Sequence, residues 1–191
     1  LTDLGQLSTN QYYDGSNHKY IATGNSSIYT QNDGTHLFAG AASGSAGGNI
    51  TYVTGLTISA AGYAITPQNP MFRGSYNGDN LGAGVISQNA NIQNRNMTHN
   101  SAGNRITVPV AGVYLITHHQ LAAANGTQTK IKINGSDLAG SRTQNISGSN
   151  ESVTTALPII LAASDYVEFS VSAGTIHGNA NYNTMSVTLI G

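Results

Sequence analysis

The segment "ITVPVAGVYLITHHQLA", residues 106–122, decides the fold class of this chain. It places Val, Ile and Leu around one Pro and one Gly, and it ends in two adjacent histidines. If the segment is a strand, alternate side chains point to opposite faces. Both faces are largely apolar, so both need a covering layer. A two-layer sandwich covers only one face of each strand with its own core. The pattern therefore predicts that the second face contacts another chain.

The two faces of this predicted strand carry different side chains. One face holds Val113, Leu115, Thr117, His119 and Leu121, and the other holds Tyr114, Ile116, His118 and Gln120. We assign the contact with neighbouring chains to Tyr114, Ile116 and His118. Because His118 and His119 point to opposite faces, they cannot reach one metal ion without a bulge, and we predict no metal site. In the alternative, three copies of His118 around a three-fold axis bind a metal or an anion.

The composition restricts the class of protein. Only 8% of the 191 residues are charged, whereas about 25% is usual. The net charge of −1 leaves no basic surface for nucleic acid. Hydroxyl and amide side chains must supply the polar surface, as in many β-rich extracellular and virion proteins. The chain has no cysteine, so it has no disulfide framework. No run of about 18 apolar residues occurs, and we expect no membrane insertion.

Glycine-containing turns and alternating polarity predict an all-β chain. Pairs such as Asp33-Gly34 and Asn134-Gly135 tolerate the positive φ of tight hairpins. Polar and apolar residues alternate over 128–133 and over 165–171, as in strands with one wet face and one core face. Helical periodicity is not convincing in any window.

The chain divides into two regions of different composition, 1–68 and 69–191, with a boundary in "TPQNP" (66–70). The first region has short apolar islands separated by small residues. Alone it could hardly bury enough surface to offset its ordering entropy of roughly 1–2 kcal/mol per residue. We therefore predict that it winds with copies of itself. Because the chain begins with Leu1 rather than Met, we expect it to be the C-terminal part of a longer protein.

Several motifs of the second region resemble the trimeric jelly-roll heads of the complement C1q and tumour necrosis factor superfamily. They are "NRITVPVAGVYLITHHQLA" (104–122), "VTTALPIILAASDYVEFSVSAG" (153–174), "MSVTLIG" (185–191) and "NPMFRG" (69–74). The resemblance covers nearly all of 69–191 and implies a jelly-roll sandwich that forms a homotrimer. One departure is Ser164, where that family usually has Gly, which puts the geometry of this turn in doubt.

The first region is similar to bacteriophage tail-fibre stems. The similarity lies in 10–62, which includes "SGSAG" and "LTISAAG". A stem followed by a trimeric head implies the distal tip of a virion tail fibre. The combination predicts a non-catalytic receptor-binding protein without cofactors. Its partners would be its own copies, the N-terminal remainder of the fibre, and a glycan or protein of the bacterial surface.

Four loops are expected at the end of the head away from the stem: 76–82, 123–127, 146–151 and 174–183. Tyrosine supplies rigid contact area and asparagine supplies adaptable hydrogen bonds. The candidate receptor-binding residues are Tyr76, Asn77, Asn80, Asn125, Asn150, His177, Asn179, Asn181 and Tyr182. Asn and Gly also favour turns for purely conformational reasons.

Two other functions are compatible with the sequence. A polysaccharide depolymerase needs two carboxylates about 5–10 Å apart. Asp165 and Glu168 would point to opposite faces of a strand, and Asp79 and Glu151 would meet only if two loops converge. The other alternative is a structural or decoration fibre of the virion, or a non-viral C1q-like adhesin.

Overall fold

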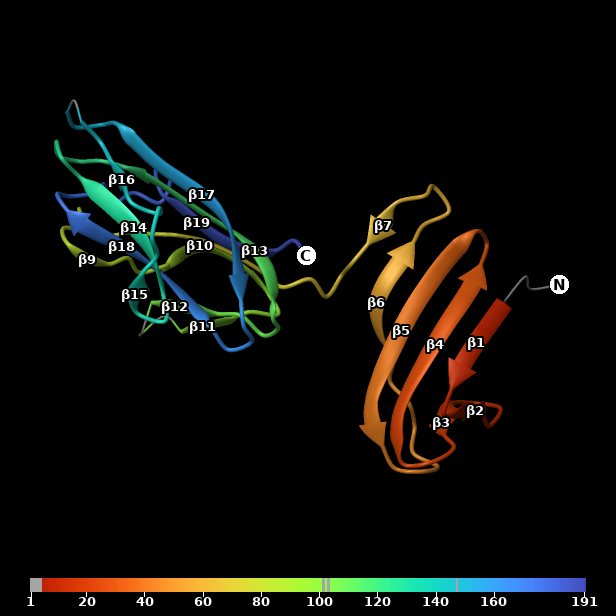
Figure 1. Ribbon diagram of the computed structural model, residues 1–191. Helices are drawn as coiled ribbons and strands as arrows, with labels where there is room; N and C mark the ends of the chain where they lie inside the picture. Colours follow the sequence, from red (N-terminus) through yellow and green to blue (C-terminus); the bar gives the residue numbers. More distant parts are fainter. Residues whose placement is uncertain (1–4, 101, 103, 147) are drawn as a thin grey trace. The chain divides into compact units, whose positions relative to one another are not determined.

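The computed structural model describes residues 5–100, 102, 104–146 and 148–191. The chain divides into two compact units, Leu1–Gln68 (unit 1) and Asn69–Gly191 (unit 2), at the same residues as the division drawn from composition. The regular elements of the described residues are β-strands in antiparallel sheets, so the all-β prediction is confirmed (Figure 1). Within these ranges no helix is long and apolar enough to cross a membrane.

Unit 1 is a single sheet with an attached hairpin. Its strands are β1 (Gly5–Thr9), β2 (Gln11–Tyr13), β3 (His18–Tyr20), β4 (Gly24–Asn32), β5 (Thr35–Gly44), β6 (Val53–Ile58) and β7 (Ala64–Ile65). The sheet order is β1-β4-β5-β6-β7, and β2 pairs with β3 (Figure 1). Asp33 and Gly34 both have positive φ at the β4–β5 turn, as predicted for this dipeptide.

The two faces of the unit 1 sheet are covered to different extents. On one face, Ile28 and Ala39 are buried, and the neighbouring Ser26 hydroxyl bonds to that of Tyr52 at 2.8 Å. On the other face, Leu7, Tyr29, Phe38 and Leu56 lie opposite one another on four adjacent strands. Leu7 is 72% exposed, and the Tyr29 and Phe38 rings stack at 4.6 Å. The second face is therefore an open apolar surface.

Unit 2 contains two packed sheets. Its strands are β8 (Met71–Ser75), β9 (Gly84–Val85), β10 (Ala90–Arg95), β11 (Thr98–Asn100), β12 (Arg105–Thr107), β13 (Gly112–Leu121), β14 (Gln128–Ile133), β15 (Ser136–Asp137), β16 (Thr143–Gln144), β17 (Ser152–Leu161), β18 (Tyr166–Ala173) and β19 (Thr184–Leu189). The five-stranded sheet has the order β10-β8-β19-β13-β17. The seven-stranded sheet has the order β11-β12-β18-β14-β15, with β16 on β14 and β9 on β18.

The last strand of unit 2 returns to pair with its first strand. β19 lies antiparallel to β8, with Val187 opposite Phe72, and the Leu189 amide donates to the Pro70 carbonyl. Asn69 and Gly191 consequently lie at the same end of unit 2. The loop after β8 and the loop before β19 lie at the opposite end.

The core of unit 2 lies between its two sheets. The face of β13 that was predicted to contact another chain lies in this core. Tyr114 and Ile116 are fully buried in the core of the single chain, and His118 is 1% exposed against the ring of Phe169. These three residues therefore cannot form the contact with another chain, and that prediction was wrong. The face available to a neighbour is the half-buried one with Leu115, Thr117 and His119. Hydropathy did not separate the faces, because both are largely apolar and each carries one histidine.

Both strands predicted from alternating polarity are present, but the outer face of the second is buried rather than exposed to solvent. β14 spans the predicted residues 128–133, and Thr129 and Ile131 face the core. In β18, however, Glu168 and Ser170 on the supposedly wet face are only 6% and 3% exposed. β18 is a central strand, flanked by β14 on one side and by β12 and β9 on the other. On this face the Glu168 carboxylate lies 3.3 Å from Arg105 Nε of β12.

The turn at Ser164 adopts the backbone geometry for which glycine is suited. Ser164 has φ of +74°, in the left-handed region. Asp165 stabilises the turn, because its carboxylate accepts hydrogen bonds from the Ala162 amide at 2.8 Å and from Asn134 Nδ2 at 2.7 Å. Serine is therefore accommodated at this position at a cost in backbone strain.

Candidate functional site

The four loops singled out from the sequence lie at one end of unit 2. Each follows or precedes a strand whose direction is set by antiparallel pairing, so all four connections fall at the end opposite Asn69 and Gly191. The loop between β18 and β19, residues 174–183, contacts the other three. We refer to the four loops together as the loop platform.

Backbone hydrogen bonds join the 174–183 loop to its neighbours. Ile176 and Leu81 exchange a pair of bonds at 2.9 and 3.0 Å, and the Ala123 amide donates to the Thr175 carbonyl at 2.8 Å. The Asn150 amide donates to the Ala122 carbonyl at 2.7 Å, which ties the loop before β17 to the same cluster. Ile176 is fully buried beneath the cluster. The platform is thus one connected structure rather than four independent loops.

Gly178 allows the 174–183 loop to approach the 76–82 loop closely. A Cβ at Gly178 would overlap the backbone oxygens of Gly78 and Asp79. The Gly78 amide donates to the Gly178 carbonyl at 2.7 Å, and the Gly178 amide donates to Asn80 Oδ1 at 3.1 Å. A side chain at this position would separate the two loops.

Two buried asparagines support the platform and were not singled out as site residues. Asn183 is fully buried, and its Nδ2 donates to the carbonyls of His177 at 2.6 Å and Asn179 at 3.0 Å. Asn145 Nδ2 donates to the Ala124 carbonyl at 3.1 Å. Nothing in the sequence distinguishes them from exposed asparagines, because their burial depends on how the loops fold together.

The candidate residues of the 76–82 loop are held by hydrogen bonds to Asn89 and within the loop itself. The Asn77 amide and carbonyl exchange hydrogen bonds with the Asn89 side chain at 2.8 and 2.7 Å. The Tyr76 hydroxyl donates to the Asp79 carbonyl at 2.9 Å, so this half-buried ring folds over its own loop. Asn77 and Asn80 are exposed.

The remaining candidates lie on the neighbouring loops. His177 Nε2 lies 2.8 Å from Asn150 Oδ1, and the His177 ring meets Tyr182 edge-on at 6.0 Å. Tyr182 is 46% exposed. Asn179 Oδ1 accepts a hydrogen bond from the Asn181 amide at 2.9 Å. Exposed Asn125 lies on the 123–127 loop, which Thr127 ties to Thr175.

The hydrogen bonds within the platform determine which groups remain for a ligand. The Oδ1 atoms of Asn80 and Asn179 accept from backbone amides, which can only donate. Their Nδ2 groups are therefore the free ends. The four loops contain no Lys or Arg, and their carboxylates are Asp79 and Glu151. The platform presents amide donors and one exposed aromatic ring without a cation.

No protein-family model and no curated protein sequence matches this chain. Its function is therefore inferred from the geometry of the platform and of the sheets that support it.

The candidates for metal binding or catalysis outside the platform, His118, Asp165 and Glu168, lie in the sheets and a turn of unit 2. Burial lowers the pKa of His118 from 6.5 to about 3, with a smaller contribution from His119, so its ring is neutral at pH 7. The described residues contain no group of three or more His, Cys, Asp or Glu side chains placed to hold a metal ion. Asp165 belongs to the Ser164 turn, and Glu168 Oε1 lies 3.3 Å from Arg105 Nε on the seven-stranded sheet.

Proposed function

We propose that this chain is the receptor-binding end of a bacteriophage tail fibre. In this proposal unit 1 is the trimeric stem, unit 2 is a jelly-roll head, and the loop platform binds the bacterial surface without catalysis. The observation that carries the proposal is the convergence of asparagine, tyrosine and histidine side chains on one connected surface. That surface lies at the end of unit 2 opposite the entry of the chain.

The chemistry of the platform favours a glycan over a protein. Hydroxyl-bearing rings offer oxygen acceptors to the free amide groups of Asn80 and Asn179, and an apolar ring face to Tyr182. The platform has no positive charge to select an acidic peptide. Glycan binding at such sites depends on many directed hydrogen bonds, which the asparagines can supply.

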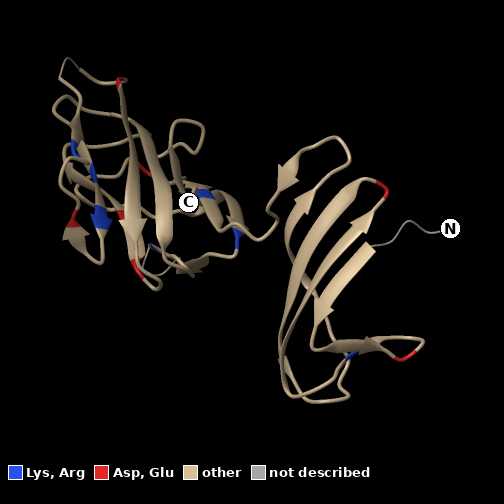
Figure 2. Cartoon of the chain, turned by 45° about the vertical axis from the view of Figure 1, so that its right-hand side comes forward, with Lys and Arg blue, Asp and Glu red and all other residues tan. Residues whose placement is uncertain are grey.

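Self-association is supported by the outward face of the five-stranded sheet. On β13, β17 and β19 the outward residues are uncharged. They are Val113, Leu115, Thr117, His119, Thr154, Ala156, Pro158, Ile160, Thr184, Ser186 and Thr188. Ile160 is 82% exposed in the single chain. The seven-stranded sheet carries Arg105, Lys130 and Lys132 on its outer side, and Figure 2 shows how few charges the rest of the chain has. The uncharged part of this face, on β13, β17 and β19, is therefore the surface expected to meet other copies, and Arg73 of β8 lies at its border.

The stem assignment is supported by the open apolar face of unit 1. A hollow of about 550 Å³ on this face is lined by Leu7, Tyr29, Phe38 and Val53, among others. A single sheet with such a face is stable in water only when another layer covers it. In the proposed fibre, copies of unit 1 supply that layer.

Binding of the labelled full chain to host cells tests the proposal. We expect the parent chain to label host bacteria and the variant Tyr182→Ala to lose at least about tenfold in affinity. Tyr63→Ala is the matched control, because Tyr63 is a 71% exposed tyrosine in unit 1, outside the platform. Equal labelling by parent and Tyr182→Ala would remove the platform from the binding site. A parent chain that labels no host cells would favour a structural role in the virion.

A further inference from the structure

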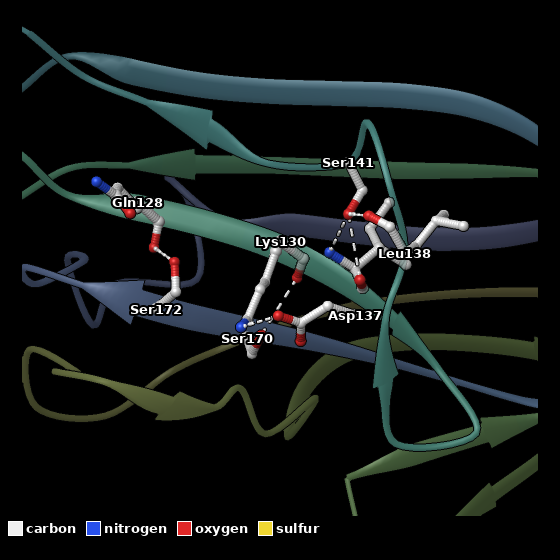
Figure 3. Close-up of polar contacts among 8 residues, drawn as sticks. Gln128, Lys130, Asp137, Leu138, Ser141, Ser170 and Ser172 are labelled. Atoms are coloured by element: carbon white, nitrogen blue, oxygen red, sulfur yellow. Dashed lines mark hydrogen bonds and ion pairs between the residues drawn. The ribbon is translucent and has the colours of Figure 1, made fainter.

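The outer side of the seven-stranded sheet contains a groove that is separate from the loop platform. It has a volume of about 290 Å³, and its lining residues are Gly84, Val85, Lys130, Lys132, Ser170, Val171 and Ser172. β18 forms its floor, β14 lies on one side, and the two-residue strand β9 pairs with the other edge of β18. Figure 3 shows Lys130 on β14 beside Ser170 on β18, and Ser172 further along the same strand.

Positive charge exceeds negative charge in this groove. Lys130 Nζ lies 2.5 Å from Asp137 Oδ2. The hydrogen bond from Lys130, followed by the charges of Lys130, Lys132 and Arg142, holds the pKa of Asp137 below its ordinary value. Within the described part of the chain, Lys132 makes no ion pair. The two lysines and Asp137 sum to +1, and exposed Arg142, whose charge also acts on Asp137, adds further positive charge beside the open groove.

Glu168 does not neutralise this charge. It is the cross-strand neighbour of Lys132, but its carboxylate lies 3.3 Å from Arg105 Nε on the other side of β18. The Arg105 guanidinium in turn lies 4.4 Å from the centre of the Tyr166 ring. This buried carboxylate is therefore engaged with its own cation, and Lys132 remains available.

The floor of the groove supplies hydroxyl donors that are only weakly bonded. Ser170 Oγ lies 3.5 Å from the Lys130 carbonyl, and Ser172 Oγ lies 3.4 Å from the Gln128 carbonyl. Hydroxyl hydrogen bonds are typically 2.5–3.0 Å long, so both hydroxyls can turn to a better acceptor. Ser170 is itself 3% exposed, at the bottom of the groove.

We propose that this groove binds the carboxylate of an acidic polysaccharide, held by Lys132 and Lys130 with hydrogen bonds from Ser170 and Ser172. This inference rests on the proposed function, because it assigns a second sugar subsite to the same head. The excess of positive charge beside the groove favours an anionic sugar over a neutral one. The platform has no Lys or Arg, so the neutral and the acidic parts of a surface glycan would bind at different places.

Titration calorimetry of the full chain with an oligogalacturonate tests the inference. We expect binding that weakens as salt rises, since screening shortens the range of the charges. Lys132→Gln is expected to reduce affinity by about tenfold, and Lys132→Arg to retain it. Arg73→Gln is the control, because it removes one exposed charge from the five-stranded sheet and should leave uronate affinity unchanged. Neutral dextran oligomers should not bind this groove.

Two outcomes would overturn the inference. One is equal uronate affinity for the parent chain and a folded Lys132→Gln variant, as judged by circular dichroism. The other is inorganic phosphate binding more tightly than galacturonate, since that would contradict the assignment of a carboxylate. Host-cell labelling distinguishes a failure of the anion groove from a failure of the proposed function. Cells labelled without uronate binding would remove the groove alone, whereas uronate binding without cell labelling would remove the receptor role and leave the anion site.

Discussion

Acidification should destabilise unit 2 through a single buried histidine. His118 is fully enclosed between Phe169 and the strands beside β13, and neither of its ring nitrogens has a hydrogen-bond partner among the described residues. Burial is the largest cause that lowers its pKa to about 3. A proton that binds this ring in the folded state must therefore place a charge in the apolar core.

The sign and size of the effect follow from proton linkage. The unfolded chain binds a proton at this residue near pH 6.5, and the folded chain only near pH 3. Above pH 6.5 both states are neutral here and the contribution to stability is complete. As pH falls through the window between these values, the free energy of unfolding drops by about 1.4 kcal/mol per pH unit. The loss at pH 4.5 is thus roughly 2.7 kcal/mol.

Denaturant unfolding of the full chain at fixed concentration, from pH 7.5 to 4.5, measures this loss. His118→Leu should remove about 1.4 kcal/mol per pH unit from the slope and leave stability at pH 7.5 equal or higher, because it replaces unpaired polar atoms with apolar ones. His119→Gln controls for changing a histidine on the same strand. Histidine-selective NMR gives a direct reading. A His118 resonance that titrates near pH 6.5 would refute the reasoning, as would a variant that keeps the parent slope.

Three further substitutions test other parts of the structure. Ile160→Asp should weaken self-association by about 3 kcal/mol or more per chain, as measured by light scattering. Ile146→Asp, at an equally exposed loop position, should leave self-association unchanged. An unchanged particle mass for Ile160→Asp would exclude this face from the contact between copies. Gly178→Ala should cost about 1–3 kcal/mol of stability and disrupt the platform, while Gly40→Ala, which meets no atom, should be tolerated. Ser164→Gly should raise the free energy of unfolding by about 0.5–1 kcal/mol, and a decrease in melting temperature would contradict strain at this turn.

Local alternation was sufficient to predict strands but not to orient them. The strand at 128–133 has one polar and one apolar face, so its pattern identified the core side directly. The strand at 113–121 has two apolar faces, and the choice between them depends on the shape of the opposing sheet. Tyr114 fills the core with its ring and still satisfies its hydroxyl through the Val110 carbonyl at 2.9 Å. Such a fit is invisible in hydropathy.

Composition indicated the loops of the candidate site but not the contacts that hold them together. Asn80 and Gly178 are hydrogen-bonded across 98 positions of sequence. Pairings of this kind depend on the whole strand order, so no local motif reveals them. The anion groove was also missed, because Lys130 and Lys132 were interpreted as an ordinary wet face. Only the pairing of β14 with β18 places them beside Ser170 and Ser172.

The edge of the five-stranded sheet distinguishes between two modes of self-association. β17 is a ten-residue edge strand without a charged side chain, whereas exposed edges are commonly protected by charges, bulges or proline. Pro158 lies in the middle of this strand and offers no amide to an added strand. Edge-to-edge pairing is therefore blocked at that point, although Ile160 leaves the adjoining face apolar. Copies of the chain that meet here are therefore expected to make contact through side chains of this sheet rather than by adding a strand to its edge.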